Sequence, residues 1–368
     1  MKVLILTAKT GMGHVVAANS IEEHFKYINR KNEVYKIDVY EKMGFFIDSI
    51  ICKGYSFLAT KMPSLYGKMY YKTNNNSLLF KFLEKINLYM GYFLLKLVSN
   101  LNPDIIISTH PFATQMISYL KEKKHINTPI INVMTDYASH KCWVNPNVDK
   151  YVISNDDMIE ELVASGVNKN NIYSYGIPID KKFSKSCERN NVLTEIGLSS
   201  SKKTILMMAG SFGVNSVFDV YKKIINCNDD IQLIVVTGKN KSLYDRFIKE
   251  IGTNKNRVKL IYFTDSIHKL MKSVDMLITK PGGLTITEAI ACRVPMVVYN
   301  AIPGQEEENI NFLIKHNIGI NLDSFTSIKQ LNDYLLDVNK INSMKDCCDR
   351  VSKINSQEKL YNLCQTMI

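Results

Sequence analysis

The sequence lacks several features that would fix its class at once. Its eight cysteines contain no Cys-x-x-Cys pair and no regular spacing, so they predict neither a zinc motif nor a disulfide framework and are typical of a reducing compartment. No run of about 18 apolar residues occurs, so the sequence predicts no membrane-spanning helix. The apolar run Val3–Leu6 after Lys2 is too short for a signal peptide. Any membrane contact should therefore be peripheral.

Acidic residues are also in short supply. The 368 residues include 46 Lys and Arg against 35 Asp and Glu, a formal net charge of +11. This excess favours a partner with negative charge, which leaves nucleic acid, anionic lipid or a phosphorylated substrate. With 46% hydrophobic residues the chain can bury a substantial core, and its length predicts two domains.

Short β-branched runs alternate with longer helical stretches in two successive series, a pattern typical of parallel sheets with crossover helices. The first series of expected strands is 3–7, 33–38, 104–108, 129–133, 150–154 and 172–175, and the second is 204–208, 232–237, 258–262, 276–279, 296–299 and 319–321. We predict an α/β fold with two Rossmann-like, doubly wound domains that face a central cleft. The expected domains are 1–180 and 181–341, with a helix over 342–368 that packs back on the first.

Glycine-rich turns follow two of the expected strands. Gly11-Met12-Gly13-His14 precedes a helix that begins near Val15, where it can be either a plain tight turn or a cradle for a phosphate. The turn Lys280-Pro281-Gly282-Gly283-Leu284-Thr285 is more specific, because it opens a helix whose N-terminus suits a diphosphate. Glu288, one turn further, can accept hydrogen bonds from ribose hydroxyls. The alternative is a glycine turn with Thr285 as a helix cap.

A polar loop follows the next expected strand. Gln305 and Glu306 in Pro303-Gly304-Gln305-Glu306 offer donor and acceptor groups that suit hexose hydroxyls. Alone, this is an ordinary loop. At the strand end after the diphosphate turn, it favours one extended nucleotide-sugar site.

The stretch from Tyr40 to Phe93 combines aromatic residues and lysines with few acidic residues. This composition suits the surface of an anionic membrane, although many of the rings can also belong to the core of the first domain. RNA is the rival partner. No RNP, KH or OB signature accompanies the stretch, and lysine far outnumbers arginine, so we expect lipid and no nucleic acid.

Taken together, the motifs resemble the bacterial diacylglycerol glucosyltransferases and plant monogalactosyldiacylglycerol synthases, relatives of the glucosaminyltransferase that makes the lipid-linked peptidoglycan precursor. The matching pieces cover most of the chain in order. They are Gly11-Met12-Gly13-His14, His110-Pro111-Phe112, Thr135-Asp136-Tyr137 with His140 and Trp143, Gly176-Ile177-Pro178-Ile179, Gly210-Ser211-Phe212-Gly213, Thr237-Gly238-Lys239-Asn240, Lys280-Pro281-Gly282-Gly283-Leu284-Thr285 and Pro303-Gly304-Gln305-Glu306.

The resemblance implies a GT-B architecture, with the acceptor lipid on the first domain, a UDP-sugar on the second, inversion at the anomeric carbon and no metal in the catalytic step. It implies His14 and Asp136 as the catalytic residues. The implied acceptor-binding residues are Gly11, Gly13, His110 and Tyr137. The implied donor-binding residues are Gly210, Ser211, Phe212, Gly213, Lys239, Asn240, Phe263, Lys280, Gly282, Gly283, Leu284, Thr285, Glu288, Gln305 and Glu306.

One residue departs from the plant pattern. Plant members have an acidic residue just before the Thr-Gly turn, where this chain has Lys9. A carboxylate at that position therefore cannot assist the base, which leaves His14 as the proton acceptor, helped by Asp136.

The predicted function is transfer of glucose or galactose from a UDP-sugar to the 3-hydroxyl of diacylglycerol, at the cytoplasmic face of the cell membrane. Two alternatives remain open. One is transfer of N-acetylglucosamine from its UDP-sugar to a lipid-linked peptidoglycan precursor. The other is a regulator that binds a nucleotide-sugar without catalysis.

Overall fold

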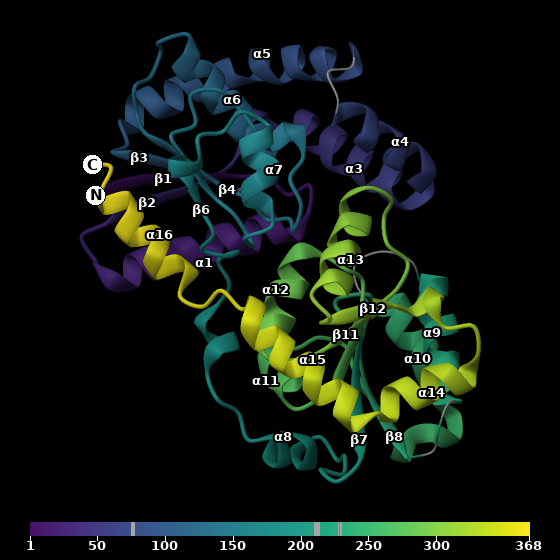
Figure 1. The fold of residues 1–368 in the computed structure, drawn as a ribbon. Coiled ribbons are helices and arrows are strands. Elements are labelled where there is room, and N and C mark those ends of the chain that lie inside the picture. The colour runs from purple at the N-terminus through teal and green to yellow at the C-terminus, as the bar shows by residue number, and fades with distance from the viewer. Residues whose placement is uncertain (75–77, 210–213, 227, 229) are drawn as a thin grey trace. The chain divides into compact units, whose positions relative to one another are not determined.

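The computed structural model describes residues 1–74, 78–209, 214–226, 228 and 230–368. Over these residues the strands form two parallel sheets of six strands each, with helices between successive strands (Figure 1). The predicted α/β class and the two doubly wound, Rossmann-like sheets are confirmed. Two compact units result: one contains Met1–Asp180, Ile302–Glu308 and Lys353–Ile368, and the other contains Lys181–Ala301 and Asn309–Ser352.

The sheet of the first unit has the order β2-β1-β3-β4-β5-β6. Its strands are β1 (Lys2–Thr7), β2 (Glu33–Asp38), β3 (Ile105–Ser108), β4 (Ile130–Val133), β5 (Lys150–Val152) and β6 (Ile172–Tyr173). Its helices are α1 (Met12–Ile28), α2 (Val39–Met43), α3 (Phe45–Lys61), α4 (Pro63–Thr73), α5 (Leu78–Leu101), α6 (Pro111–Glu122), α7 (Met158–Ala164) and α16 (Ser356–Gln365).

The first sheet is buried on both faces, as its β-branched runs predict. Along β1, Val3 and Ile5 pack with side chains of α1 and α16, whereas Leu4 and Leu6 pack with side chains of α5 and α6. The alternation follows from the two-residue period of a strand. Because β1, β3 and β4 are parallel neighbours, their carboxyl ends lie side by side between the two helical layers.

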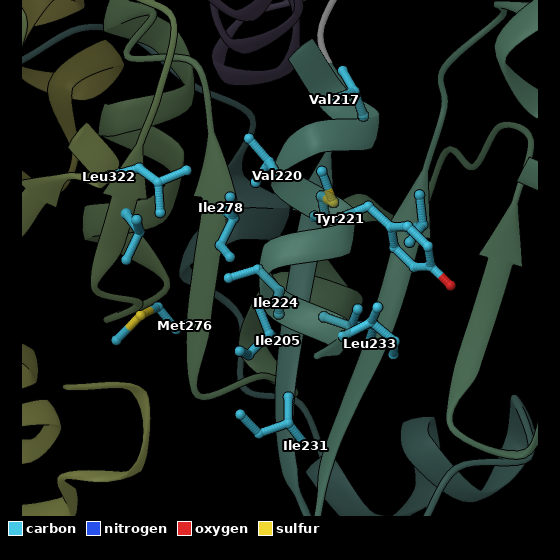
Figure 2. Close-up of a cluster of buried hydrophobic side chains, with 14 of the residues drawn as sticks. Ile205, Val217, Val220, Tyr221, Ile224, Ile231, Leu233, Met276, Ile278 and Leu322 are labelled. Carbon is cyan, nitrogen blue, oxygen red and sulfur yellow. The ribbon is translucent and has the colours of Figure 1, made fainter. Parts of the chain in front are cut away.

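The sheet of the second unit has the order β12-β11-β10-β7-β8-β9. Its strands are β7 (Lys203–Met208), β8 (Ile231–Val236), β9 (Val258–Ile261), β10 (Met276–Thr279), β11 (Met296–Val298) and β12 (Gly319–Asn321). The helices after the first unit's α7 are α8 (Arg189–Glu195), α9 (Val214–Ile225), α10 (Lys241–Ile251), α11 (Ile267–Lys272), α12 (Gly283–Ala291), α13 (Gln305–Lys315), α14 (Ile328–Leu336) and α15 (Val338–Val351). Figure 2 shows Val217, Val220 and Ile224 of α9 over Ile205, Leu233 and Ile278 of the sheet.

The closing stretch 342–368, expected as a single helix, contains two helices. α15 ends at Val351 in the second unit, and α16 begins at Ser356 in the first. Between them Asn355 adopts a left-handed conformation with φ 59°, which an α-helix cannot continue. α16 packs on α1: the rings of Phe25 and Tyr361 meet edge to face at 5.0 Å.

Three helices, α3 to α5, fill the connection between α2 and β3. α5 packs closely on α6, since a Cβ atom added at Gly91 would lie only 2.9 Å from the carbonyl oxygen of Met116. Within the described ranges, no helix is both long and apolar enough to cross a bilayer.

Candidate active site

His14 lies in the first turn of α1 and is held from two neighbouring strand ends. Its Nδ1 donates to the main-chain carbonyl of Thr109, 2.9 Å away just beyond β3, and the hydroxyl of Thr135 beyond β4 lies 2.7 Å from the same nitrogen. A main-chain carbonyl can only accept, so Nδ1 carries the proton. In the neutral ring Nε2 then has the lone pair and is the atom that can take up a proton.

The surroundings of His14 keep the imidazole neutral. Burial lowers the pKa of His14, and the negative charge of Asp136 and the hydrogen bond to Thr109 oppose that shift in part. His110 meets the His14 ring edge to face at 4.7 Å, and burial lowers the pKa of His110 well below its usual range. A neutral imidazole is the form a general base needs.

Asp136 follows Thr135 and has both carboxylate oxygens engaged. Oδ2 accepts from Nε1 of Trp143 at 3.1 Å, and Oδ1 accepts from the side-chain amide of Gln305. The hydrogen bonds of His14 go to Thr109 and Thr135, so Asp136 influences the imidazole through its charge.

His14 and Asp136 both line a pocket of about 370 Å³ in the first unit. Most of its wall is aromatic or aliphatic and comes from α3, α4, α5 and the start of α6. The lining residues are Thr10, His14, Ile51, Tyr55, Leu58, Tyr66, Met69, Tyr70, Thr73, Phe80, Glu84, His110, Pro111, Phe112, Gln115, Asp136, His140, Cys142, Trp143 and Gln305. The pocket can therefore take an apolar molecule that presents a hydroxyl to Nε2 of His14.

Of the four expected acceptor-binding residues, His110 lines this pocket, and Gly11, Gly13 and Tyr137 do not. Gly11 is the N-cap of α1, directly before the helix begins at Met12. Tyr137 is buried, and its carbonyl accepts from the side-chain amide of Asn155 at 3.1 Å. Lys9, the departure from the plant pattern, forms an exposed ion pair with Glu41.

The glycine turn of the second unit connects β10 to α12. Gly282 is the N-cap of α12 and makes no side-chain cap hydrogen bond, so Thr285 does not hold the N-cap position. The side-chain amide of Asn309 donates to the carbonyl of Pro281 at 2.9 Å and holds the turn in place. This arrangement leaves a helix N-terminus with main-chain donors, which suits an anion.

A second feature of this unit lies at the carboxyl ends of β7 and β8. A pocket of about 600 Å³ is lined there by residues that include Lys239 and Asn240. Asn240 also caps α10 by accepting from the Leu243 N–H at 3.0 Å. The ammonium of Lys239 lies 4.7 Å from the ring centre of Phe263, which is 45% exposed. The expected residues Gly210, Ser211, Phe212 and Gly213 lie outside the described ranges.

Gln305 and Glu306 belong to the segment Ile302–Glu308 of the first unit. Gln305 donates to Asp136, and the carboxylate of Glu306 accepts from the Ile302 N–H at 2.7 Å. Gly304 has φ +93°, and a Cβ atom there would lie 2.5 Å from the ring of Tyr70 on α4. The glycine thus allows close packing that brings Gln305 to Asp136.

Sequence reasoning missed Thr109, Gln115 and Asn309, and it named Thr135 only as part of the motif Thr135-Asp136-Tyr137. Thr109 directly follows β3, and Thr135 lies two residues after the end of β4. Their position was a usable signal, since functional groups gather at the carboxyl ends of parallel strands. Gln115 and Asn309 lie inside helices, where the sequence offers no comparable signal.

Comparisons with known proteins agree with this architecture. Residues 14–179 match the family model described as monogalactosyldiacylglycerol (MGDG) synthase, and residues 195–353 match glycosyl transferases group 1. Among solved structures, MurG of Acinetobacter baumannii has a TM-score of 0.64 at 12% identity and covers 99% of each chain. HepE of Anabaena, in complex with UDP-glucose, has a TM-score of 0.56 at 13% identity over the full length of both chains. At such identities these structures show a shared fold.

Curated relatives are closer in sequence. The processive diacylglycerol beta-glucosyltransferase of Bacillus pumilus is 32% identical over 94% of this chain and 89% of that protein. The enzyme of the same name from Bacillus subtilis is 32% identical over 97% and 93%, and that from Staphylococcus carnosus is 30% identical over 100% and 92%. These identities extend through both units, and the chain therefore belongs to the family of the processive diacylglycerol beta-glucosyltransferases.

Proposed function

We propose that the chain transfers a hexose from a UDP-sugar to the 3-hydroxyl of diacylglycerol, with inversion at the anomeric carbon. The observation that carries this proposal is His14, whose Nδ1 is fixed by the Thr109 carbonyl so that Nε2 meets an apolar pocket as a proton acceptor. The names of the curated relatives support diacylglycerol as acceptor and glucose as sugar.

In the proposed reaction the lipid hydroxyl oxygen attacks the anomeric carbon. Its proton passes to Nε2 of His14, and the bond from the anomeric carbon to the diphosphate breaks, so that UDP leaves with the electron pair. Asp136 favours the resulting imidazolium through its negative charge. The first unit takes the acceptor in this scheme, with His110 in the pocket wall, and Gly11 and Gly13 shape the turn that positions His14.

The second unit takes the donor. The uncapped first turn of α12, over Gly283, Leu284 and Thr285, supports a diphosphate site because its main-chain N–H groups and helix dipole stabilise developing negative charge. Lys280 adds positive charge to this turn, and Glu288 takes the ribose hydroxyls. Lys239, Asn240 and Phe263 contact the rest of the nucleotide, and Gly210, Ser211, Phe212 and Gly213 complete the donor site.

The roles of Gln305 and Glu306 in this proposal follow from their segment. Gln305 presents its amide beside Asp136, and Glu306 orders the loop through the Ile302 N–H. We assign both to the sugar end of the donor, where Gln305 has a second amide hydrogen for a hexose hydroxyl.

The test is a panel of UDP-glucose, UDP-galactose and UDP-N-acetylglucosamine, each with diacylglycerol in vesicles, followed by mass analysis of the lipid. We expect a hexosyl-diacylglycerol and release of UDP. A parallel reaction supplies the lipid-linked peptidoglycan precursor as acceptor. Transfer only to that precursor, or binding of UDP-sugars with no transfer to any lipid, would refute the proposal.

We further propose that α5 attaches the enzyme to an anionic membrane as a peripheral protein at the cytoplasmic face. The exposed positions of α5 recur every three or four residues and so form one face of the helix. This face carries Leu78, Lys81, Lys85, Ile86, Tyr89, Tyr92, Phe93 and Lys96. The opposite face, with Phe80, Asn87, Gly91, Leu94 and Val98, is buried. Apolar groups next to lysines fit a headgroup region with negative charge.

Vesicle sedimentation tests the membrane proposal. The double variant Lys85→Glu, Tyr89→Ser should bind anionic vesicles several-fold less than wild type, with unchanged weak binding to neutral vesicles. Lys359→Glu is the matched control, because Lys359 is an exposed lysine of α16, a helix of the opposite layer of the first unit. Equal losses in both variants would show that only total charge matters, and would contradict a role for α5.

A further inference from the structure

We propose that Gln115 recognises an ester carbonyl of the acceptor lipid and so determines the enzyme's choice between ester and ether glycerolipids. This inference rests on the proposed function, which supplies diacylglycerol as the acceptor. Gln115 lies one turn into α6, is 4% exposed and lines the pocket that contains His14. A carboxamide at such a depth in a largely apolar wall needs hydrogen-bond partners for both of its ends.

A neighbouring side chain fixes how the Gln115 amide is turned. Nδ2 of Asn87 on α5 donates to the main-chain carbonyl of Phe112 at 3.1 Å and to Oε1 of Gln115 at 2.6 Å. The Phe112 carbonyl can only accept, so the NH₂ group of Asn87 must point this way. Gln115 therefore turns its oxygen to Asn87, and its NH₂ group is the end left over.

That NH₂ group has no protein acceptor within the described ranges. Another buried side chain of the pocket wall, His110, has a ring nitrogen without a partner, Nδ1, within the described ranges. His140, in contrast, is paired on both ring nitrogens: it donates from Nε2 to the Tyr70 carbonyl at 3.0 Å and accepts at Nδ1 from the Cys142 N–H at 3.1 Å. The Gln115 side chain is buried and lines the pocket, and its NH₂ group is the end without a protein acceptor. A ligand that brings an acceptor into the pocket can therefore hydrogen-bond to Gln115.

Two groups of opposite hydrogen-bonding character therefore belong to one pocket: Nε2 of His14, which accepts a proton, and the NH₂ group of Gln115, which donates a hydrogen bond. Diacylglycerol carries the matching pair, a hydroxyl that gives up its proton and ester carbonyl oxygens a few bonds away. A dialkylglycerol has the same hydroxyl and a similar apolar body but lacks the carbonyl oxygens. Sites that hydrogen-bond a substrate group discriminate against analogues that lack it.

The experiment compares kcat/KM for diacylglycerol and its dialkyl ether analogue in the same mixed vesicles, with wild type and two variants. Gln115→Met has a similar volume but no donor. Asn87→Leu keeps the NH₂ group of Gln115 but removes the hydrogen bond that fixes its orientation. The ether lipid, which lacks the carbonyl oxygens, controls in each variant for a merely structural effect. We expect the kcat/KM of wild type to be about fivefold to tenfold higher for the ester lipid, because this ratio corresponds to the net contribution of one neutral hydrogen bond.

In Gln115→Met the ratio should fall to about one through a loss on the ester lipid alone. In Asn87→Leu the ratio should lie between those of Gln115→Met and wild type, because a freed amide presents its NH₂ group to the pocket only part of the time. Equal efficiency of wild type on both lipids, or an unchanged ratio in Gln115→Met, would overturn this inference and leave the proposed function intact. Failure of wild type to transfer sugar to either lipid would overturn the proposed function and the inference with it.

Discussion

The substitution His14→Asn isolates the proton acceptor of the proposed reaction. Nδ2 of an asparagine occupies nearly the place of Nδ1 of the imidazole, so the variant can still donate to the Thr109 carbonyl, which lies 2.9 Å from Nδ1 in the structure. It has no atom in the place of Nε2. The change therefore removes the base and preserves the contact that ties α1 to the end of β3.

The variant loses the proton acceptor but keeps the contact with Thr109, so we expect a large loss of turnover. Loss of a general base lowers turnover by about 10²- to 10⁴-fold, which corresponds to about 2.7 to 5.4 kcal/mol in the activation free energy. The folding stability and the affinity for UDP should change little, because the retained hydrogen bond lies in the first unit and the expected nucleotide site lies in the second. The variant His14→Gln provides the contrast, since its longer amide cannot reach the Thr109 carbonyl in the same way.

The assay is UDP release with diacylglycerol vesicles, together with UDP titration and urea denaturation of each variant. We expect His14→Asn to lose turnover at near wild-type stability, and His14→Gln to lose both turnover and stability. Turnover of His14→Asn within about threefold of wild type would remove the imidazole from the proton transfer, because such a change lies far below the range for a general base.

Three further predictions concern pH, packing and the nucleotide site. Burial holds the pKa of His14 below its usual value, so kcat/KM should fall only below about pH 6.5. The negative charge of Asp136 raises the pKa of His14, so its removal in Asp136→Asn should lower that pKa and move the acid limb of the profile to still lower pH. A pH-rate profile that stays in place would contradict the coupling. Gly91→Leu should lower the free energy of unfolding by about 1–3 kcal/mol, because the larger side chain overpacks against α6. Gly54 lies in α3 with open space around it, so Gly54→Ala should raise the free energy of unfolding by about 0.5–1 kcal/mol. Urea denaturation measures both changes. Glu288→Ala should weaken UDP binding by about tenfold in calorimetric titration, the loss of one or two hydrogen bonds, and normal affinity would exclude the ribose role.

Much of the fold was predictable because its signals are local. The β-branched runs that predict strands at 3–7 and 276–279 are observed as β1 and β10, since a strand buried on both faces requires a nearly continuous apolar run. The glycine turn before α12 was predictable for the same reason: a strand end, a glycine and a helix start follow one another in the chain.

The amphipathic character of α5 was only half visible in the sequence. Its lysines and aromatic rings stand out in the composition, but many of the rings were equally compatible with the core of the first domain. The packing of Gly91 against Met116 decides which face of the helix is buried. Tyr89 and Phe93 fall on the exposed side as a consequence.

By itself the sequence determined the element order, the glycine turns and the candidate base, because each depends on residues that are neighbours in the chain. Only the tertiary structure decided the tautomer of His14, the pairing of Asp136 with Gln305 and the orientation of Gln115. The partners in these contacts are separated by 95, 169 and 28 positions. A hydrogen bond depends on distance and direction in space, and a sequence states neither until the strands and helices have packed.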